Sequence, residues 1–296
     1  MWFVDPGTPA IGTISQSGTV TEYTKGLQRR SRLISIVAAP DGTMWFSDAF
    51  GYIGRVDQTG TITEFSINAF SKTQSPLGIA VDAQGAVWTL ARGPFESQLI
   101  RSDSQGHLTA VALPHGELAD GTLAADAQGD LWMLVQHGQT AAILERAVAG
   151  NYVEYPTPLQ AAFEVCCPNI SPKRIAIAAG GYPWFTTTYW LDPNANSQVV
   201  GEISHAAATF YPLNAANVGY SALPSGITSD AGSIWFTGDD PFQINGVLWN
   251  VTPGGTQKAY ALPFSLISLG SDSSGAIWLT AQGFGHPGQI IETRLR

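Results

Sequence analysis

The chain has 296 residues, a formal net charge of −9 and only 12% charged residues, about half the usual charged share. The acidic balance argues against nucleic acid as a partner, because binding to a phosphate backbone depends on Lys and Arg. No apolar run approaches the ~18 residues of a membrane span. The N-terminus has no basic stretch followed by an apolar run, so no signal peptide is visible.

Seven Trp residues recur along the chain at an almost constant interval, with gaps of 43, 43, 44, 52, 51 and 43 residues. Each stands in a similar local phrase, such as Asp-Gly-Thr-Met-Trp-Phe at residues 41–46. In a strand-rich chain, self-similarity over ~40–50 residues is typical of propeller blades. The sequence therefore predicts one all-β domain over residues 1–296, a seven-bladed β-propeller of four-stranded antiparallel blades. Its B-strand markers are Trp2, Trp45, Trp88, Trp132, Trp184, Trp235 and Trp278.

The second repeat shows the unit most clearly. Four short runs rich in β-branched and aromatic residues, which we call strands A to D, cover residues 33–38, 43–47, 52–56 and 61–65. Turns that contain Gly separate A from B and C from D. Gly is expected there because tight hairpins need a residue that tolerates positive φ. The pattern indicates an antiparallel meander.

Consecutive strands alternate in direction, which gives each blade two different ends. The A–B and C–D turns share one end, the turn face, and the B–C loops and D–A links share the other, the loop face. Most of the length variation falls on the loop face, in residues 156–174, 186–199, 238–247 and 281–288. Variable loops on a rigid scaffold often carry binding, although neutral drift would explain any single insertion. We expect a binding face here, around the mouth of the central channel.

The strand count is incomplete at the termini. The chain begins at a B strand, residues 1–4, and ends at a C strand, residues 289–293. One A strand and one D strand are therefore missing from the predicted ring. We expect either a truncated chain or an under-stranded blade at the seam, where an unpaired edge would invite fraying or association.

The repeated phrase resembles the virginiamycin B lyase (streptogramin lyase) propeller family over essentially the whole chain. The matching segments are Leu-Gly-Ile-Ala-Val-Asp at residues 77–82, Ile-Gly-Arg-Val at 53–56 and Thr-Ile-Thr-Glu-Phe at 61–65. The resemblance implies a lyase that opens a cyclic depsipeptide by elimination, using a His base, a nearby carboxylate and Mg²⁺. That chemistry needs a base to abstract the proton and a cation to hold the enolate charge.

The sequence departs from the family pattern at these positions. The family base is expected in a Pro-His-Gly/Ala-Ile phrase at the start of a late A strand, but none of the A-strand entries contains this His. The recurrent Glu after the B-strand Trp-Phe-Thr is also absent, and only Asp48 gives a carboxylate there. A Pro-His-Gly occurs at residues 114–116, earlier than the pattern places it. These departures argue against family-type catalysis, and whether the protein is an enzyme stays open.

The candidate residues lie mostly in the predicted loops. If a relocated base exists, it would be His115, His137 or His286. No pair of candidate ligands has metal-ligand spacing, so no metal site or other cofactor is predicted, and Mg²⁺ enters only with the lyase alternative. Aromatic and charged loop residues suit a ligand platform, although the aromatics could instead pack on their own loops. The candidate ligand-binding set is Asp48, Arg92, His137, Lys173, Tyr189, Trp190, Asp239, Asp240 and Phe242.

The two cysteines, Cys166 and Cys167, are adjacent in the long D–A link. A vicinal disulfide is one alternative, although neighbouring Cα atoms only ~3.8 Å apart would strain it. Two free buried thiols are the other. A disulfide would suit an oxidising compartment, and we expect an extracellular or periplasmic protein, secreted from a bacterium.

Three functions follow as hypotheses. The first is a diverged, lyase-like propeller that binds a small molecule, peptide or glycan on the loop face. The second is an active, metal-dependent C–O lyase acting on a cyclic depsipeptide or related substrate. The third is a structural or protein-interaction propeller. We expect a monomer with no nucleic-acid partner and no membrane span.

Overall fold

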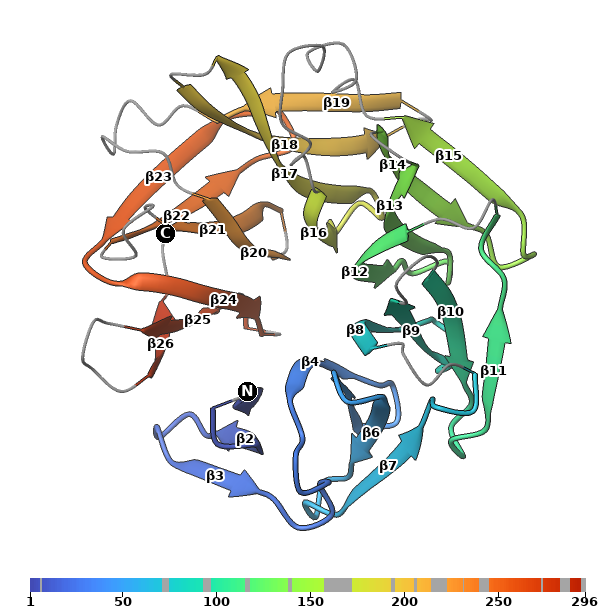
Figure 1. The fold of residues 1–296 in the computed structure, drawn as a ribbon. Coiled ribbons are helices and arrows are strands. Elements are labelled where there is room, and N and C mark those ends of the chain that lie inside the picture. Colours follow the sequence, from blue (N-terminus) through green and yellow to red (C-terminus); the bar gives the residue numbers. More distant parts are fainter. Residues whose placement is uncertain are drawn as a thin grey trace. The chain divides into compact units, whose positions relative to one another are not determined.

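The computed structural model describes residues 1–5, 7–70, 75–92, 97–114, 118–137, 140–156, 172–192, 195–204, 207–213, 223–230, 232–239, 245–272, 274–282 and 288–293. In these ranges the labelled elements are all β-strands, which pair antiparallel in seven separate sheets (Figure 1). The sheets are the blades of a seven-bladed β-propeller, which confirms the predicted fold class. No helix with the length and apolarity of a membrane span occurs in the described segments.

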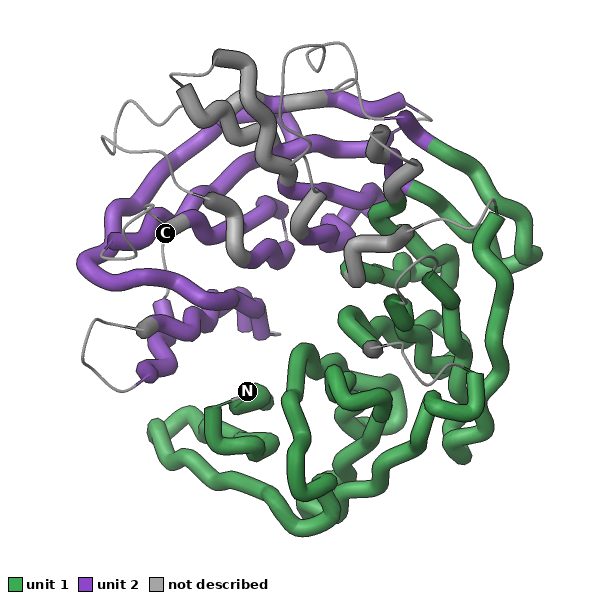
Figure 2. The backbone as a smooth tube through the Cα atoms, viewed as in Figure 1, with its two compact units in different colours: residues 1–137, 144–154 green, residues 138–143, 155–296 purple. Residues whose placement is uncertain are grey.

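The chain divides into two compact units (Figure 2). Unit 1 comprises residues 1–137 and 144–154 and contains the first four blades, except for residues 138–143 and the end of β15. In chain order its strands are β1 (Trp2–Asp5), β2 (Ala10–Ile14) and β3 (Val20–Tyr23); β4 (Leu33–Ala38), β5 (Met44–Asp48), β6 (Tyr52–Val56) and β7 (Ile62–Ser66); β8 (Ser75–Val81), β9 (Val87–Arg92), β10 (Ser97–Ser102) and β11 (Leu108–Val111); and β12 (Leu118–Ala125), β13 (Leu131–His137), β14 (Thr140–Arg146) and β15 (Tyr152–Pro156).

Unit 2 comprises residues 138–143 and 155–296 and contains blades five to seven. Its strands are β16 (Pro172–Ile177), β17 (Pro183–Asp192), β18 (Ala195–Ser204) and β19 (Ala207–Pro212); β20 (Leu223–Ser229), β21 (Ile234–Asp239), β22 (Gly246–Val251) and β23 (Gln257–Leu262); and β24 (Ser265–Ser271), β25 (Ile277–Gln282) and β26 (Gln289–Thr293). Within each sheet the strands pair with their neighbours in the sequence.

The first and last blades have three strands each in the described residues, whereas the other five have four. The first sheet is β1-β2-β3 and the last is β24-β25-β26. The first therefore has no A strand and the last no D strand, as the sequence predicts. The N-terminal ammonium extends the first sheet by donating to the Ile14 carbonyl at 3.0 Å.

The recurrent Trp residues form the packing core of the blades. Six of them are less than 9% exposed, and only Trp2 is intermediate. In four blades the indole also bonds to an Asp of the preceding A–B turn. Trp88 Nε1, for example, donates to Asp82 Oδ2 at 2.8 Å, while Asp82 Oδ1 accepts from the turn amides of Gln84 and Ala86. One carboxylate thus closes the turn and anchors the core. The other three pairs are Trp132–Asp126, Trp235–Asp230 and Trp278–Asp272.

A second repeated contact explains the Ile-Gly phrase of the C strands. Phe46, which follows the core Trp, pairs across the sheet with Gly54, and a Cβ on Gly54 would lie 2.2 Å from Phe46 Cζ. The ring therefore occupies the space that a side chain would take. Phe3 with Gly12 and Phe185 with Gly201 repeat this arrangement.

Hydrogen bonds tie neighbouring blades together inside each unit. In unit 1, Arg55 Nη1 donates to the Ser104 carbonyl at 2.7 Å, joining blades two and three. In unit 2, Ser229 Oγ donates to the Ile177 carbonyl at 2.7 Å, and Ser271 Oγ to the Ser229 carbonyl at 2.6 Å. These bonds hold the A strands of adjacent blades in a fixed register.

One expectation about the loops is wrong. Residues 186–199 are not a B–C loop, because β17 and β18 extend through this segment as a paired hairpin from Thr186–Val200 to Asp192–Ala195. Tyr189 and Trp190 are therefore strand residues, and His137 likewise ends β13 instead of lying in a loop. The run Thr-Thr-Thr-Tyr-Trp at residues 186–190 consists of residue types that favour strands, which accounts for the extension.

Candidate functional site

The loop end of each of the six described A strands contains a β-bulge. In blade two the register shifts between Leu33 and Ser35, so that Ile34 is the extra residue. A bulge turns its extra residue away from the regular alternation and is common beside binding sites. Ile34 and Ile267, both bulge residues, are 38% and 52% exposed. The extra residues in blades two, three, five, six and seven are Ile34, Leu77, Lys173, Ser225 and Ile267, and blade four inserts Asp120, Gly121 and Thr122.

These bulges coincide with the phrase in which the resemblance places a His base. Leu77 and Ser225 both stand in a Pro-x-Gly-Ile sequence, at the position between Pro and Gly. The bulge residues of blades two, three and seven are aliphatic, and those of blades five and six are Lys and Ser. Imidazole is absent from all five positions. The Pro-x-Gly-Ile pattern in the sequence could have indicated where the bulges lie. The shift in register itself is visible only in the paired strands.

Asp48 is buried beneath the D–A link that enters blade two. We call this link, residues 24–32, the strap. Asp48 is 0% exposed, and its Oδ1 accepts from the backbone N–H groups of Arg32 at 3.0 Å and Phe50 at 2.9 Å. Its Oδ2 is buried without a hydrogen-bond partner. The carboxylate therefore fastens the strap and is not on the surface, where the sequence had placed a ligand contact.

Glu64 on β7 fastens the strap at a second point, and sequence reasoning did not single it out. Its Oε2 accepts from the Gln28 backbone N–H at 2.9 Å, and its Oε1 is buried without a partner. Burial, together with the nearby charge of Asp48, raises the pKa of Glu64 from 4.5 to about 7. The contact joins residues 36 positions apart, so no local sequence signal marks it.

The remaining predicted residues cluster at loop ends within their units. Asp48, Arg92 and His137 end the B strands β5, β9 and β13 of unit 1, and Arg92 is exposed. In unit 2, Asp239 ends β21, Lys173 lies at the bulge of β16, and Tyr189 and Trp190 pair with Ser197 and Asn196 in the hairpin. The predicted residues His115, Cys166, Cys167, Asp240, Phe242 and His286 lie outside the described residues.

The two carboxylates beneath the strap, Asp48 and Glu64, do not fit the Mg²⁺ that the resemblance implies. No group of three or more His, Cys, Asp or Glu residues comes together to hold a metal in the described ranges. Mg²⁺ is usually bound through one or two carboxylates and keeps several waters of its octahedral shell. Asp48 Oδ2 and Glu64 Oε1 are both shut off from solvent, so this pair does not suit a hydrated ion.

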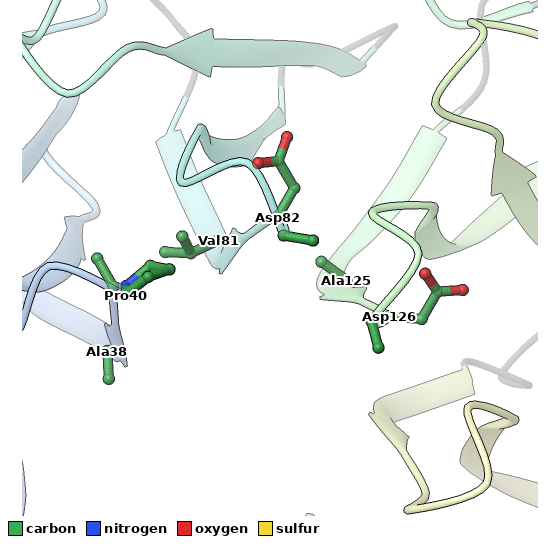
Figure 3. A pocket seen from close by; sticks show the side chains of 9 residues that line it. Ala38, Pro40, Val81, Asp82, Ala125 and Asp126 are labelled. Atoms are coloured by element: carbon green, nitrogen blue, oxygen red, sulfur yellow. The ribbon is translucent and has the colours of Figure 1, made fainter.

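A cleft of about 410 Å³ lies at the opposite end of unit 1, among the A–B turns of blades two to four (Figure 3). Its two carboxylates, Asp82 and Asp126, are already bonded to Trp88 and Trp132. The rest of its lining consists of Ala, Pro and Val. With its carboxylates committed to the core, this cleft has little to orient a polar ligand.

Comparison with known proteins identifies the family. The profile of the Virginiamycin B lyase family matches residues 1–162. A streptogramin B lyase structure is similar to this chain at 20% identity, with a TM-score of 0.72 and coverage of 99% of this chain and 89% of that one. A catalytically inactive virginiamycin B lyase from Staphylococcus aureus, solved with quinupristin, gives 20% identity, a TM-score of 0.73 and coverage of 95% and 87%.

The same fold occurs in proteins of other names. Kuenenia stuttgartiensis hydrazine synthase is similar at 13% identity, with a TM-score of 0.76 and coverage of 99% of this chain and 92% of that chain. No curated protein matches this sequence. Identities this low carry the fold alone, whereas the family profile covers more than half of the chain. On that basis, the chain belongs to the virginiamycin B lyase family.

Proposed function

We propose that this protein is a diverged member of the family that binds a small molecule, peptide or glycan at the loop ends of its blades. The observation that carries the proposal is the set of bulge residues. In blades two, three and seven these residues are Ile34, Leu77 and Ile267, and an aliphatic side chain neither accepts nor donates a proton. At three of the five positions where the family phrase could place a base, the residue is therefore aliphatic, which favours binding over elimination.

The long hairpin of blade five supports the same proposal. β17 and β18 are ten residues each, longer than the other strands described in unit 2. Their extension is at the loop end, and it carries Tyr189 and Trp190 close to the turn. Tyr and Trp, which combine a large apolar ring with a polar atom, make good ligand platforms, because little conformational entropy is lost when a ligand stacks on them.

Substitution at the hairpin tests the proposal. A panel of oligosaccharides, peptides and small cyclic depsipeptides is screened by thermal shift, and each hit is then titrated by calorimetry. We expect the double variant Tyr189→Ser with Trp190→Ser to bind a ligand found in the screen about tenfold more weakly than the wild type. Loss of a central aromatic contact produces an effect of this size. Tyr182→Ser, at the A–B turn of the same blade, is the control. Equal affinity of the two variants for the ligand would show that the hairpin is not part of the site. Failure to find a ligand in any of the three classes would count against binding.

A further inference from the structure

The strap across blade two gathers four of the 14 Lys and Arg residues of the chain. Lys25, Arg29, Arg30 and Arg32 are all exposed. Among the described residues, none of these four side chains takes part in an ion pair or a hydrogen bond. A chain with a net charge of −9 therefore presents a local group of exposed cations that form no ion pairs.

The carboxylates beneath the strap explain why its cations stay unpaired. Asp48 and Glu64 accept from the backbone N–H groups of Arg32 and Gln28, at 3.0 Å and 2.9 Å, and so hold the main chain instead of the guanidinium groups. The strap is also folded on itself, because both the amide and the hydroxyl of Ser31 donate to the Gln28 carbonyl. A backbone fixed at several points loses little further freedom on binding, so only the side chains remain to be ordered.

An exposed aromatic ring adjoins this cationic surface. Phe50 is 58% exposed. Its backbone N–H shares Asp48 Oδ1 with that of Arg32, and the N–H of Ala49 donates to the Arg32 carbonyl at 3.0 Å. The B–C turn and the end of the strap are thus bonded side by side. An exposed Phe of this size has no packing role on its open face.

We propose that the strap and Phe50 bind a short oligosaccharide containing uronic acids. The planar guanidinium forks of Arg29 and Arg30 match sugar carboxylates in paired hydrogen bonds, and the Phe50 ring offers a flat apolar surface to a pyranose face. A uronic acid carries both features on one ring. The net charge of the protein opposes a long polyanion that reaches beyond the strap. This inference rests on the proposed function, of which it selects the glycan alternative.

The test uses trigalacturonate as the probe, with neutral maltotriose and a tri-glutamate peptide as comparisons. Calorimetric titration should detect trigalacturonate in low salt and not maltotriose. Arg29→Glu with Arg30→Glu should weaken binding at least about tenfold, since two charge-assisted contacts are lost. Arg101→Glu with Lys258→Glu makes the same change in net charge at residues that do not belong to the strap and should leave the affinity within about twofold. Phe50→Ala should weaken the binding of trigalacturonate, and Phe50→Tyr, which brings back an aromatic ring, should restore it.

Three results would overturn the inference. One is no detectable binding of trigalacturonate, and another is equal weakening by the two charge-reversal pairs, which would indicate a general field effect. The third is tri-glutamate binding as tightly as trigalacturonate without dependence on Phe50, which would assign the strap to acidic peptides. A ligand that depends on the Tyr189 and Trp190 hairpin, but not on the strap, would leave the proposed function standing while refuting the strap as its site.

Discussion

Residues with fixed local partners could be predicted from the sequence, and residues with distant partners could not. The core role of Trp88 follows from its place in the repeat, and its partner Asp82 is only six positions away. The burial of Asp48 depends instead on the strap lying over it, with Arg32 16 positions away. The sequence therefore predicts Asp48 at the surface, because it indicates the position of Asp48 at the end of a B strand and does not indicate the strap that covers it.

Glu64 makes the stability of the protein dependent on pH. Its pKa is raised from 4.5 to about 7, first by burial and then by the charge of Asp48. Between these pH values the folded chain holds a proton that the unfolded chain has lost. The free energy of unfolding therefore falls as the pH rises from about 4.5 to about 7 and is level above that range. Because Glu64 is only half-buried, screening limits the change to about 1–2 kcal/mol.

Urea unfolding midpoints at about pH 5 and about pH 8 measure this dependence. In Glu64→Gln the change between the two pH values should be smaller than in the wild type, because the amide does not titrate, while its oxygen still accepts from the Gln28 N–H. Glu22→Gln, at an exposed position of β3, serves as the control and should keep the wild-type dependence. A wild-type protein that is equally stable at both pH values would contradict the assignment to Glu64.

At the scale of the element, the four-stranded meander was readable because its turns and its packing residues recur. The sequence predicts a loop in place of the blade-five hairpin because the length of this segment breaks the repeat, even though its Thr-rich run favours a strand. The bulges are not predicted, for a related reason. A one-residue shift in pairing depends on both strands of a pair, and the Pro-x-Gly-Ile phrase indicates only one of them.

The Phe46–Gly54 pair tests how tightly a blade is packed. Gly54→Ala places a Cβ where the Phe46 ring lies, and overpacking of this kind costs about 1–3 kcal/mol. Chemical denaturation should show a lower midpoint for this variant. Gly232→Ala is the matched control, because nothing lies within 4 Å of its added Cβ, and its midpoint should change little. Adding Phe46→Leu to Gly54→Ala should recover part of the loss, whereas an unchanged midpoint for Gly54→Ala alone would show that the ring can move aside.

At the scale of the whole molecule, repetition made the fold class readable and divergence made the function harder to read. Seven Trp residues gave the number of blades, and the strand count at the two termini agreed with the described sheets. The candidate site could be predicted only as a set of loop ends, since the predicted residues come from separate blades. The expectation of a single domain over residues 1–296, a monomer and an extracellular or periplasmic location stay predictions.

The proposed function is binding without catalysis of the family reaction. The most direct test incubates the protein with a streptogramin B antibiotic and excess Mg²⁺ and follows ring opening by liquid chromatography, because an elimination leaves the mass unchanged. The cyclic compound should disappear no faster than in the protein-free control, with an active streptogramin B lyase as the positive control. Ring opening that requires this protein and Mg²⁺, and that is lost in His115→Ala, His137→Ala or His286→Ala, would contradict it.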